Sequence, residues 1–250
     1  MGRLTPSRYA SDNDWVGAED YVLVQGLRDT RGALARWQRD PGPVLREWFG
    51  WSLIVAVGLL SAVWLVATVA TPDLGELWLA GISYDPTAAD VAAVLGRNAL
   101  VLALHATACV AGFIAGSSLR HAAAQRTGLS RVIHEKAGPV GIAFVVVATC
   151  FSLTTQAYVL GSAASTLSDQ IGVTPGVLIL TVLPHAIPEL VALFLPLAAW
   201  LIASRRDEWQ DLLAATFATV GLAVPILVIA ALIETYIWPQ LLIAASPWLS

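Results

Sequence analysis

Five long runs of apolar residues alternate with polar and charged segments along this chain. The runs cover approximately residues 51–70, 98–118, 138–160, 173–203 and 212–238. A helix needs about 20 mostly apolar residues to cross a bilayer, because the hydrocarbon is about 30 Å thick and each residue adds about 1.5 Å. Each run meets this length, so the pattern predicts an all-α, polytopic transmembrane helical bundle with about five spans.

The fourth run is long for one straight crossing and contains prolines near its middle. A single helix over residues 173–203 would reach about 45 Å, well beyond the hydrocarbon. Pro184 and Pro188 lack the N–H that a helix interior needs and therefore interrupt its backbone hydrogen bonds. We predict that these prolines break the fourth span, a feature that often marks the substrate or ion site in transporters.

Polar sequence precedes the spans. Residues 18–39 have an amphipathic helical pattern, and the Asp-Pro-Gly-Pro sequence at residues 40–43 is predicted to end it. We interpret residues 1–49 as a cytoplasmic amphipathic N-terminal segment, which is either an interfacial anchor or a docking surface for a cytoplasmic partner. Residues 50–240 then form the transmembrane helical domain, and residues 241–250 form a short external tail.

Arginine and lysine are unevenly distributed among the connectors. Seven arginines precede the first span, four cations lie between the second and third spans, and two arginines follow the fourth. Positively charged loops stay in the cytoplasm. We therefore predict a multi-pass protein of the cell membrane with a cytoplasmic N-terminus and an external C-terminus. Arg97 alone lies in a connector on the external side.

The composition agrees with a lipid environment. Hydrophobic residues make up 57% of the 250 residues and charged residues only 13%, whereas soluble domains are about 25% charged. The net charge of −4 leaves no basic surface of the kind that binds nucleic acid, so that class is excluded. The expected partners are the lipid bilayer and other proteins, and the oligomeric state is left open.

Few ionisable side chains lie within the predicted spans, namely His105, His185, Glu189 and Glu234. A charge at membrane depth is costly and is by default a functional candidate. His185 and Glu189 are four residues apart, which would place them on one helical face, near enough to hydrogen-bond or to share a cation. Alternatively, both bond to the interrupted backbone and hold a kinked span in place.

Glu234 lies near the outer end of the fifth span. It either pairs with His185, Arg97 or Asn98 or stays solvated alone, and we interpret His105 as a hydrogen-bonded packing residue. One histidine and two carboxylates suit some catalytic metals. However, the chain has no His-Glu-x-x-His motif, no phosphate loop and no nucleophile elbow. The sequence therefore predicts no metal and no cofactor, and it defines no catalytic residue.

Several of these residues fit a family pattern. The matching positions are Asn98, Pro184, His185, Glu189, Leu190, Ile233, Glu234 and Pro239. Over roughly residues 45–240, the pattern resembles the stage II sporulation protein M family of polytopic membrane proteins. The family usually has Gly after the histidine and a large apolar residue before the glutamate, whereas this chain has Ala186 and Pro188.

The resemblance implies an integral membrane protein that acts in a membrane complex. In spore formers the namesake works with peptidoglycan-degrading partners during engulfment of the forespore, and similar proteins occur in organisms that make no spores. We therefore predict a non-enzymatic membrane scaffold or component of a membrane complex. One alternative is a transporter or ion-coupled permease that uses His185 and Glu189. Another is an intramembrane metal-dependent hydrolase that also uses Glu234.

Overall fold

The computed structural model describes residues 22–73, 79, 81–118 and 129–249, and its regular elements are all helices. In chain order these are α1 (Val22–Arg39), α2 (Gly42–Val69), α3 (Ala88–Phe113), the π-helical segment η2 (Ile114–Ser118), α5 (Leu129–Gln170) and α6 (Pro175–Arg206). They are followed by the 3-10 helix η3 (Trp209–Asp211), α7 (Leu212–Leu232), the π-helical segment η4 (Ile233–Ile237) and α8 (Trp238–Ala245).

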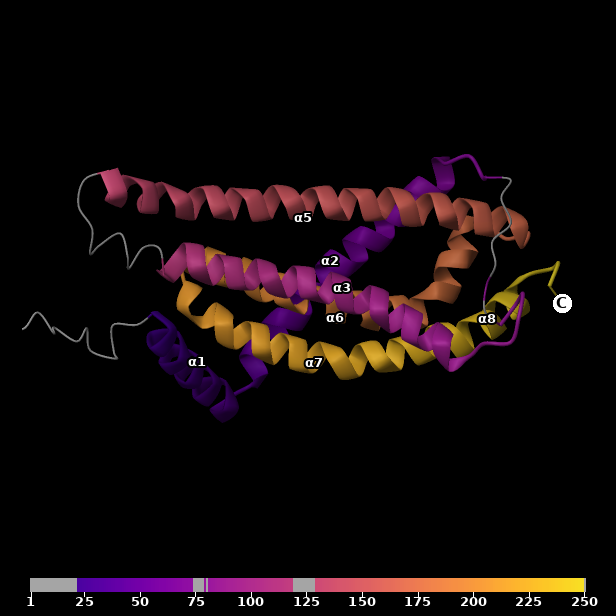
Figure 1. Cartoon of the computed structure of the whole chain (residues 1–250). Coiled ribbons are helices and arrows are strands. Elements are labelled where there is room, and N and C mark those ends of the chain that lie inside the picture. Colours follow the sequence, from indigo (N-terminus) through magenta and orange to yellow (C-terminus); the bar gives the residue numbers. More distant parts are fainter. Residues whose placement is uncertain (1–21, 74–78, 80, 119–128, 250) are drawn as a thin grey trace, which may run out of the picture.

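Five helical runs are long and apolar enough to cross a membrane. They are Gly42–Val69, Ala88–Gly116, Ile142–Gln170, Pro175–Arg206 and Trp209–Ala245. This confirms the predicted helical bundle with five candidate spans. Figure 1 shows α1 at one end of the molecule and α8 with the C-terminus at the opposite end, as an odd number of crossings requires.

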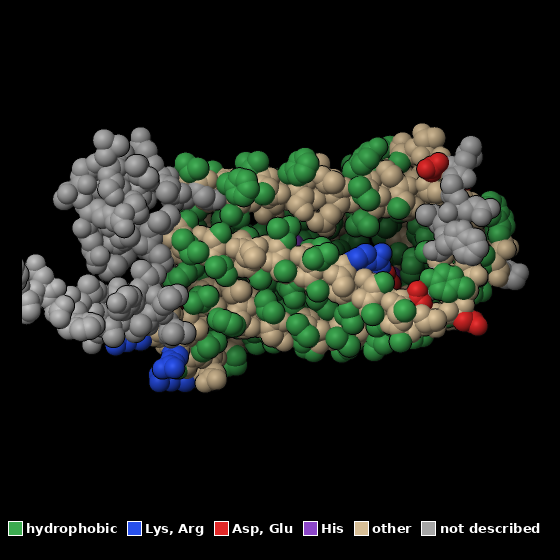
Figure 2. Space-filling model, in the orientation of Figure 1, with side chains coloured by type: hydrophobic (Ala, Val, Ile, Leu, Met, Phe, Trp, Pro, Cys, Tyr) green, Lys and Arg blue, Asp and Glu red, His purple; other side chains and the backbone are tan. Residues whose placement is uncertain are grey.

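α6 is the central helix of the bundle. Every residue from Leu190 to Trp200 is buried, and α2, α3 and α7 pack around it. Phe194 of α6, Leu59 of α2 and Leu227 of α7 belong to the same buried apolar cluster. On the face that Figure 2 shows, apolar side chains are spread along the length between the two ends, as expected for helices that contact lipid.

The prolines of α6 do not break the helix, so the predicted break is wrong. Pro184, Pro188 and Pro196 lie inside one continuous helix, whose ribbon bends along its length in Figure 1. Each proline removes a single backbone donor. Because Pro184 and Pro188 are about one turn apart, their missing donors fall on the same side of the helix, which continues through both positions.

α3 begins at Ala88, well before the start that the hydropathy pattern predicted near Asn98. A capping box fixes this start, because the hydroxyl and the N–H of Thr87 donate to Oδ2 of Asp90 at 2.7 and 2.8 Å. The Tyr84 hydroxyl also donates to Asp90, at 2.8 Å. Asn98 therefore does not open the span but lies in the interior of α3, next to Arg97, which is not in a connector.

Helix ends also differ from the predicted segments at the two termini of the chain. The described part of the amphipathic N-terminal segment forms α1, which ends at Arg39 as predicted; residues 1–21 lie outside the described residues. α2 begins at Gly42 and α8 ends at Ala245. α2 therefore crosses the predicted boundary between the N-terminal segment and the transmembrane domain at residue 50. α8 crosses the predicted boundary with the external tail at residue 241.

Candidate functional site

His185, Glu189 and Glu234 come together inside the bundle. One potential ligand atom from each side chain, an imidazole nitrogen or a carboxylate oxygen, lies within 4.8 Å of the other two. His185 and Glu189 are one turn apart on α6, and Glu234 comes from η4 in the fifth span. We call these three residues the polar cluster. The sequence did not reveal this convergence, since it left the partner of Glu234 open.

The polar cluster lies well inside the helical part of the molecule. With a rise of about 1.5 Å per residue, His185 is about 15 Å from the start of α6 at Pro175. Glu234 is at a similar distance from the end of α8 at Ala245. Both helices belong to runs that are long enough to span the hydrocarbon, so the cluster lies at membrane depth.

The local backbone positions Glu234. The residue belongs to the π-helical turn Ile233–Ile237, and single π-turns inside helices often occur at functional sites. Pro239 follows one turn later and cannot donate to the carbonyl of Thr235, which favours a wider turn immediately before it. No periodicity in the sequence indicates this π-turn, so the direction of Glu234 was not predictable.

His185 is buried and held by an aromatic neighbour. His185 is only 5% exposed, and its Nδ1 has no hydrogen-bond partner among the described residues. The Trp238 ring lies 5.4 Å from the imidazole, centroid to centroid, at an angle of 59°. Nε1 of Trp238 donates to Oγ1 of Thr181 at 3.3 Å, which fixes the indole against α6.

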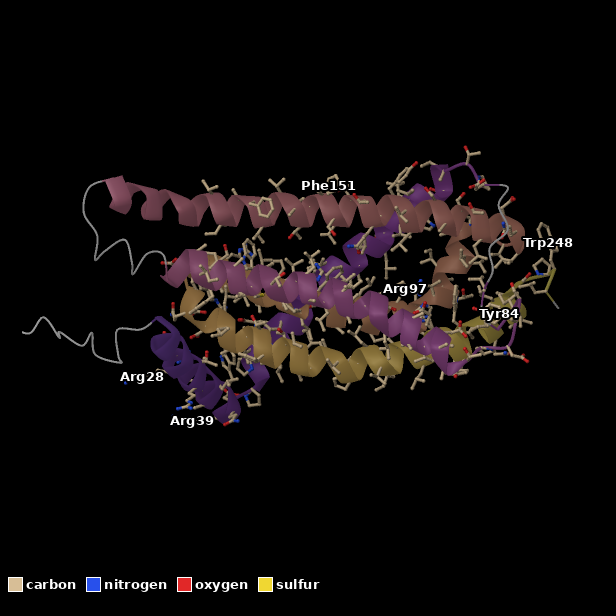
Figure 3. All side chains as sticks on the ribbon, viewed as in Figure 1. Arg28, Arg39, Tyr84, Arg97, Phe151 and Trp248 are labelled. Carbon is tan, nitrogen blue, oxygen red and sulfur yellow. The ribbon has the colours of Figure 1, made fainter. Side chains whose placement is uncertain are left out.

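α3 adds two polar side chains to the surroundings of the cluster. Nη2 of Arg97 lies 3.7 Å from Oε1 of Glu234, and Figure 3 shows Arg97 between the two ends of the molecule. Asn98 is buried beside the carboxylate of Glu189, but its Nδ2 makes no hydrogen bond to a described residue. Arg97 was one of the three partners that the sequence left open for Glu234, although it was assigned to a connector; the Thr-x-x-Asp signal at residues 87–90 would have placed it within a helix.

A cavity of about 420 Å³ opens beside the cluster. Its wall is formed mostly by aliphatic side chains of α2, α5 and α6, together with His185, Glu189, Glu234 and Arg97. Figure 2 shows the surface hollowed between α3 and α5, with basic and acidic groups at the hollow. The volume lies in the range of small-molecule sites, about 300–1,000 Å³.

The segment that carries the cluster matches a known family. The family model of Stage II sporulation protein M matches residues 139–239. The match confirms the resemblance, and it includes His185, Glu189 and Glu234 but not Asn98. No curated protein and no solved structure matches the chain. Together with the five membrane-length helices, the match identifies an integral membrane protein.

His105 and Cys109, two other buried side chains of α3, have backbone partners on α6. Nδ1 of His105 lies 2.9 Å from the carbonyl oxygen of Leu193. The thiol of Cys109 donates to the carbonyl oxygen of Pro196 at 3.0 Å. Both side chains thus bind α6 near its third internal proline, and His105 is the hydrogen-bonded packing residue that we predicted. Pro184, the remaining predicted site residue, is exposed next to His185.

Proposed function

We propose that this protein is a non-enzymatic scaffold, the membrane component of a protein complex in the cell membrane. Its N-terminus faces the cytoplasm and its C-terminus faces outward. One observation carries the proposal: α1 is packed onto the end of the bundle and forms a charged groove there. The family resemblance, which implies work within a complex, agrees with it.

Close polar contacts fix the elements at this end of the bundle. Nη2 of Arg36 donates to Oδ2 of Asp211 at 2.6 Å and links α1 to η3. Nη2 of Arg206 donates to Oε1 of Glu47 at 2.8 Å and links the end of α6 to α2. The rings of Trp37 and Trp48 meet edge to face at 5.1 Å. α1 is thus a folded part of the protein.

Burial distinguishes the two interpretations of the N-terminal segment. An interfacial anchor would turn its apolar side toward lipid, but α1 buries Thr30 and Ala33 against the protein. Arg31, Gln38 and Arg39 of α1 are exposed. The packing therefore favours a docking surface over an anchor.

The groove beside α1 has both signs of charge. It encloses about 310 Å³, and the charged side chains that line it are Arg36, Asp40, Glu47, Arg206, Glu208 and Asp211. Alternating charges around an apolar floor provide the electrostatic complementarity by which protein partners recognise one another. We therefore place the docking site for a cytoplasmic protein in this groove.

Crosslinking in native membranes tests this function. Purification of the full chain after crosslinking should recover a defined partner, and the paired reversal Asp40→Arg with Glu208→Arg should abolish that recovery. Asp169→Arg, an exposed acid at the opposite end of the bundle, is the matched control and should keep the partner. A chain that purifies alone, or a groove variant that retains the partner, would contradict the proposal.

A second candidate function is an ion-coupled permease. The observation that favours it is the polar cluster at membrane depth beside the 420 Å³ cavity; the continuous α6 removes the argument from a broken helix. Proton flux into proteoliposomes, followed with an internal pH-sensitive dye, should collapse in Glu189→Gln. Equal flux through the wild type and this variant would count against a permease.

A further inference from the structure

We propose that His185, Glu189 and Glu234 bind one divalent metal ion of the zinc class. This site is separate from the docking groove and does not depend on the scaffold function. One imidazole nitrogen and two carboxylate oxygens form a ligand set that catalytic zinc ions use in proteins. Sequence spacing alone could not establish such a site, because it places only His185 and Glu189 on one helical face.

The geometry of the cluster is close to that of a metal centre. Ligand atoms about 2.0–2.2 Å from zinc lie about 3.3–3.6 Å from one another at the corners of a tetrahedron. Here the three potential ligand atoms lie within 4.8 Å of one another. Small rotations of the two flexible glutamate side chains would close this difference without movement of α6 or η4.

The hydrogen bonding of the cluster also points to a bound ion. Buried polar atoms in proteins nearly always have a partner. Nδ1 of His185, in a residue that is 5% exposed, has none among the described residues. Asn98 lies buried beside the carboxylate of Glu189. The imidazole is thus free to coordinate, and Asn98 is placed to orient Glu189 as the groups behind metal ligands do.

Charge balance favours a divalent cation over an ion pair alone. Two carboxylates close together at membrane depth repel each other and have lost much of their hydration. Arg97 supplies one positive charge, but its contact with Glu234 is 3.7 Å long, compared with 2.6 and 2.8 Å for the pairs Arg36–Asp211 and Arg206–Glu47. Across the described ranges, no ion pair involves Glu189. A divalent ion would neutralise both carboxylates at once.

The cavity lies where the open coordination position of a bound zinc ion would be. Three protein ligands leave one position of a tetrahedral zinc ion open for water or a ligand, as in catalytic sites. His185, Glu189 and Glu234 all lie on the wall of the 420 Å³ cavity. The open position would therefore face the cavity, so a small molecule could reach the ion.

Zinc binding by the full-length protein tests the proposal. The chain is purified in detergent, its affinity tag is removed, it is treated with a chelator, and it is titrated with zinc chloride in competition with a chromophoric chelator. We expect one zinc ion per chain by elemental analysis, and an affinity at least about 100-fold lower in His185→Gln, Glu189→Gln and Glu234→Gln. Asp169→Asn, which removes an exposed acid outside the cluster and outside the docking groove, should bind like the wild type.

Three further measurements keep the outcome decisive. Circular dichroism and size-exclusion chromatography verify that each variant is folded, and X-ray absorption should show nitrogen and oxygen ligands without sulfur. A folded wild type that binds no stoichiometric zinc would overturn the proposal. Equal zinc affinity in the wild type and the two glutamate variants would overturn it as well, because the metal would then lie elsewhere.

Discussion

Arg97 and Glu234 approach each other to 3.7 Å and thereby connect α3 with η4. These residues belong to the second and the fifth candidate span, which are far apart in the sequence but adjacent in the bundle. The contact brings a cation from α3 to the polar cluster, whose other two members, His185 and Glu189, lie on α6. It therefore ties three spans together around one set of charges.

The first prediction concerns the energy of this contact. Because the side chain of Arg97 is 71% exposed and the contact is long, a double-mutant cycle with Arg97→Gln and Glu234→Gln should give a coupling of at most about 1 kcal/mol. The measurement is reversible unfolding in mixed micelles. A coupling of several kcal/mol would show that the pair, and not a metal ion, is the main neutralising interaction of Glu234.

The second prediction concerns the hydrogen bond between His105 and the carbonyl of Leu193, at 2.9 Å. His105→Leu keeps the apolar volume but leaves this carbonyl with one bond fewer. Hydrogen bonds between membrane helices contribute about 0.6 kcal/mol on average and up to about 1.7 kcal/mol, so we expect a loss of that size. Thr107→Val is the control, since Thr107 is exposed and bonds only within α3. An equal effect of both substitutions would contradict the specific role of His105.

The third prediction concerns the close approach of α5 to α2. A Cβ atom at Gly161 would lie 2.9 Å from the backbone oxygen of Val63 and would collide with Val66. Gly161→Ala should therefore lower the free energy of unfolding by about 1–3 kcal/mol through overpacking. Gly58→Ala is the matched control, because Gly58 has open space around it; helix propensity should make this variant neutral or more stable by up to about 1 kcal/mol.

The outcome for Gly161 distinguishes two kinds of contact between these helices. If Gly161→Ala is as well tolerated as Gly58→Ala, α5 is held by lipid and by contacts outside the described residues. If it is destabilising as predicted, the small residue is required for direct helix packing, as is common between membrane helices.

The fourth prediction concerns orientation in the membrane. In a background with Cys109→Ala and Cys150→Ala, a membrane-impermeant maleimide should label Asp169→Cys in intact cells. It should label Asp40→Cys only after permeabilisation, because Asp40 lies at the end with α1 and Asp169 at the end with α8. This expectation rests on the arginine-rich connectors, which stay cytoplasmic. The reverse labelling pattern would place α1 outside the cell.

The spans were predictable from sequence because lipid selects apolar residues over a fixed length. The common face of His185 and Glu189 followed from helix geometry alone. The start of α3 was not found by hydropathy, because Asp90 and Arg97 interrupt the apolar residues of its first turns. The capping signal of Thr87 and Asp90 was present, but it competes with the stronger apolar pattern that begins near Asn98.

Two features of the site depend on tertiary packing and were not predictable. The direction of Glu234 is set by the π-turn before Pro239, for which hydropathy carries no signal. The prediction that Pro184 and Pro188 break the helix was wrong. It treated α6 as an isolated helix and left out the neighbouring helices that hold α6 in place. Convergence of the cluster depends on both features, so sequence spacing alone could not show it.

The last prediction concerns the bend of α6, which places His185 and Glu189 against η4. Pro184→Ala or Pro188→Ala restores one backbone donor and should straighten the helix, which moves the two ligands relative to Glu234. We expect zinc affinity to fall about 10–100-fold, as for other changes behind metal ligands, while the protein becomes no less stable. Pro196→Ala, farther along α6 and outside the cluster, should leave zinc affinity unchanged. The distance between spin labels at the two ends of α6 reports the bend directly, so a straightened helix with full zinc affinity would show that the bend does not position the ligands.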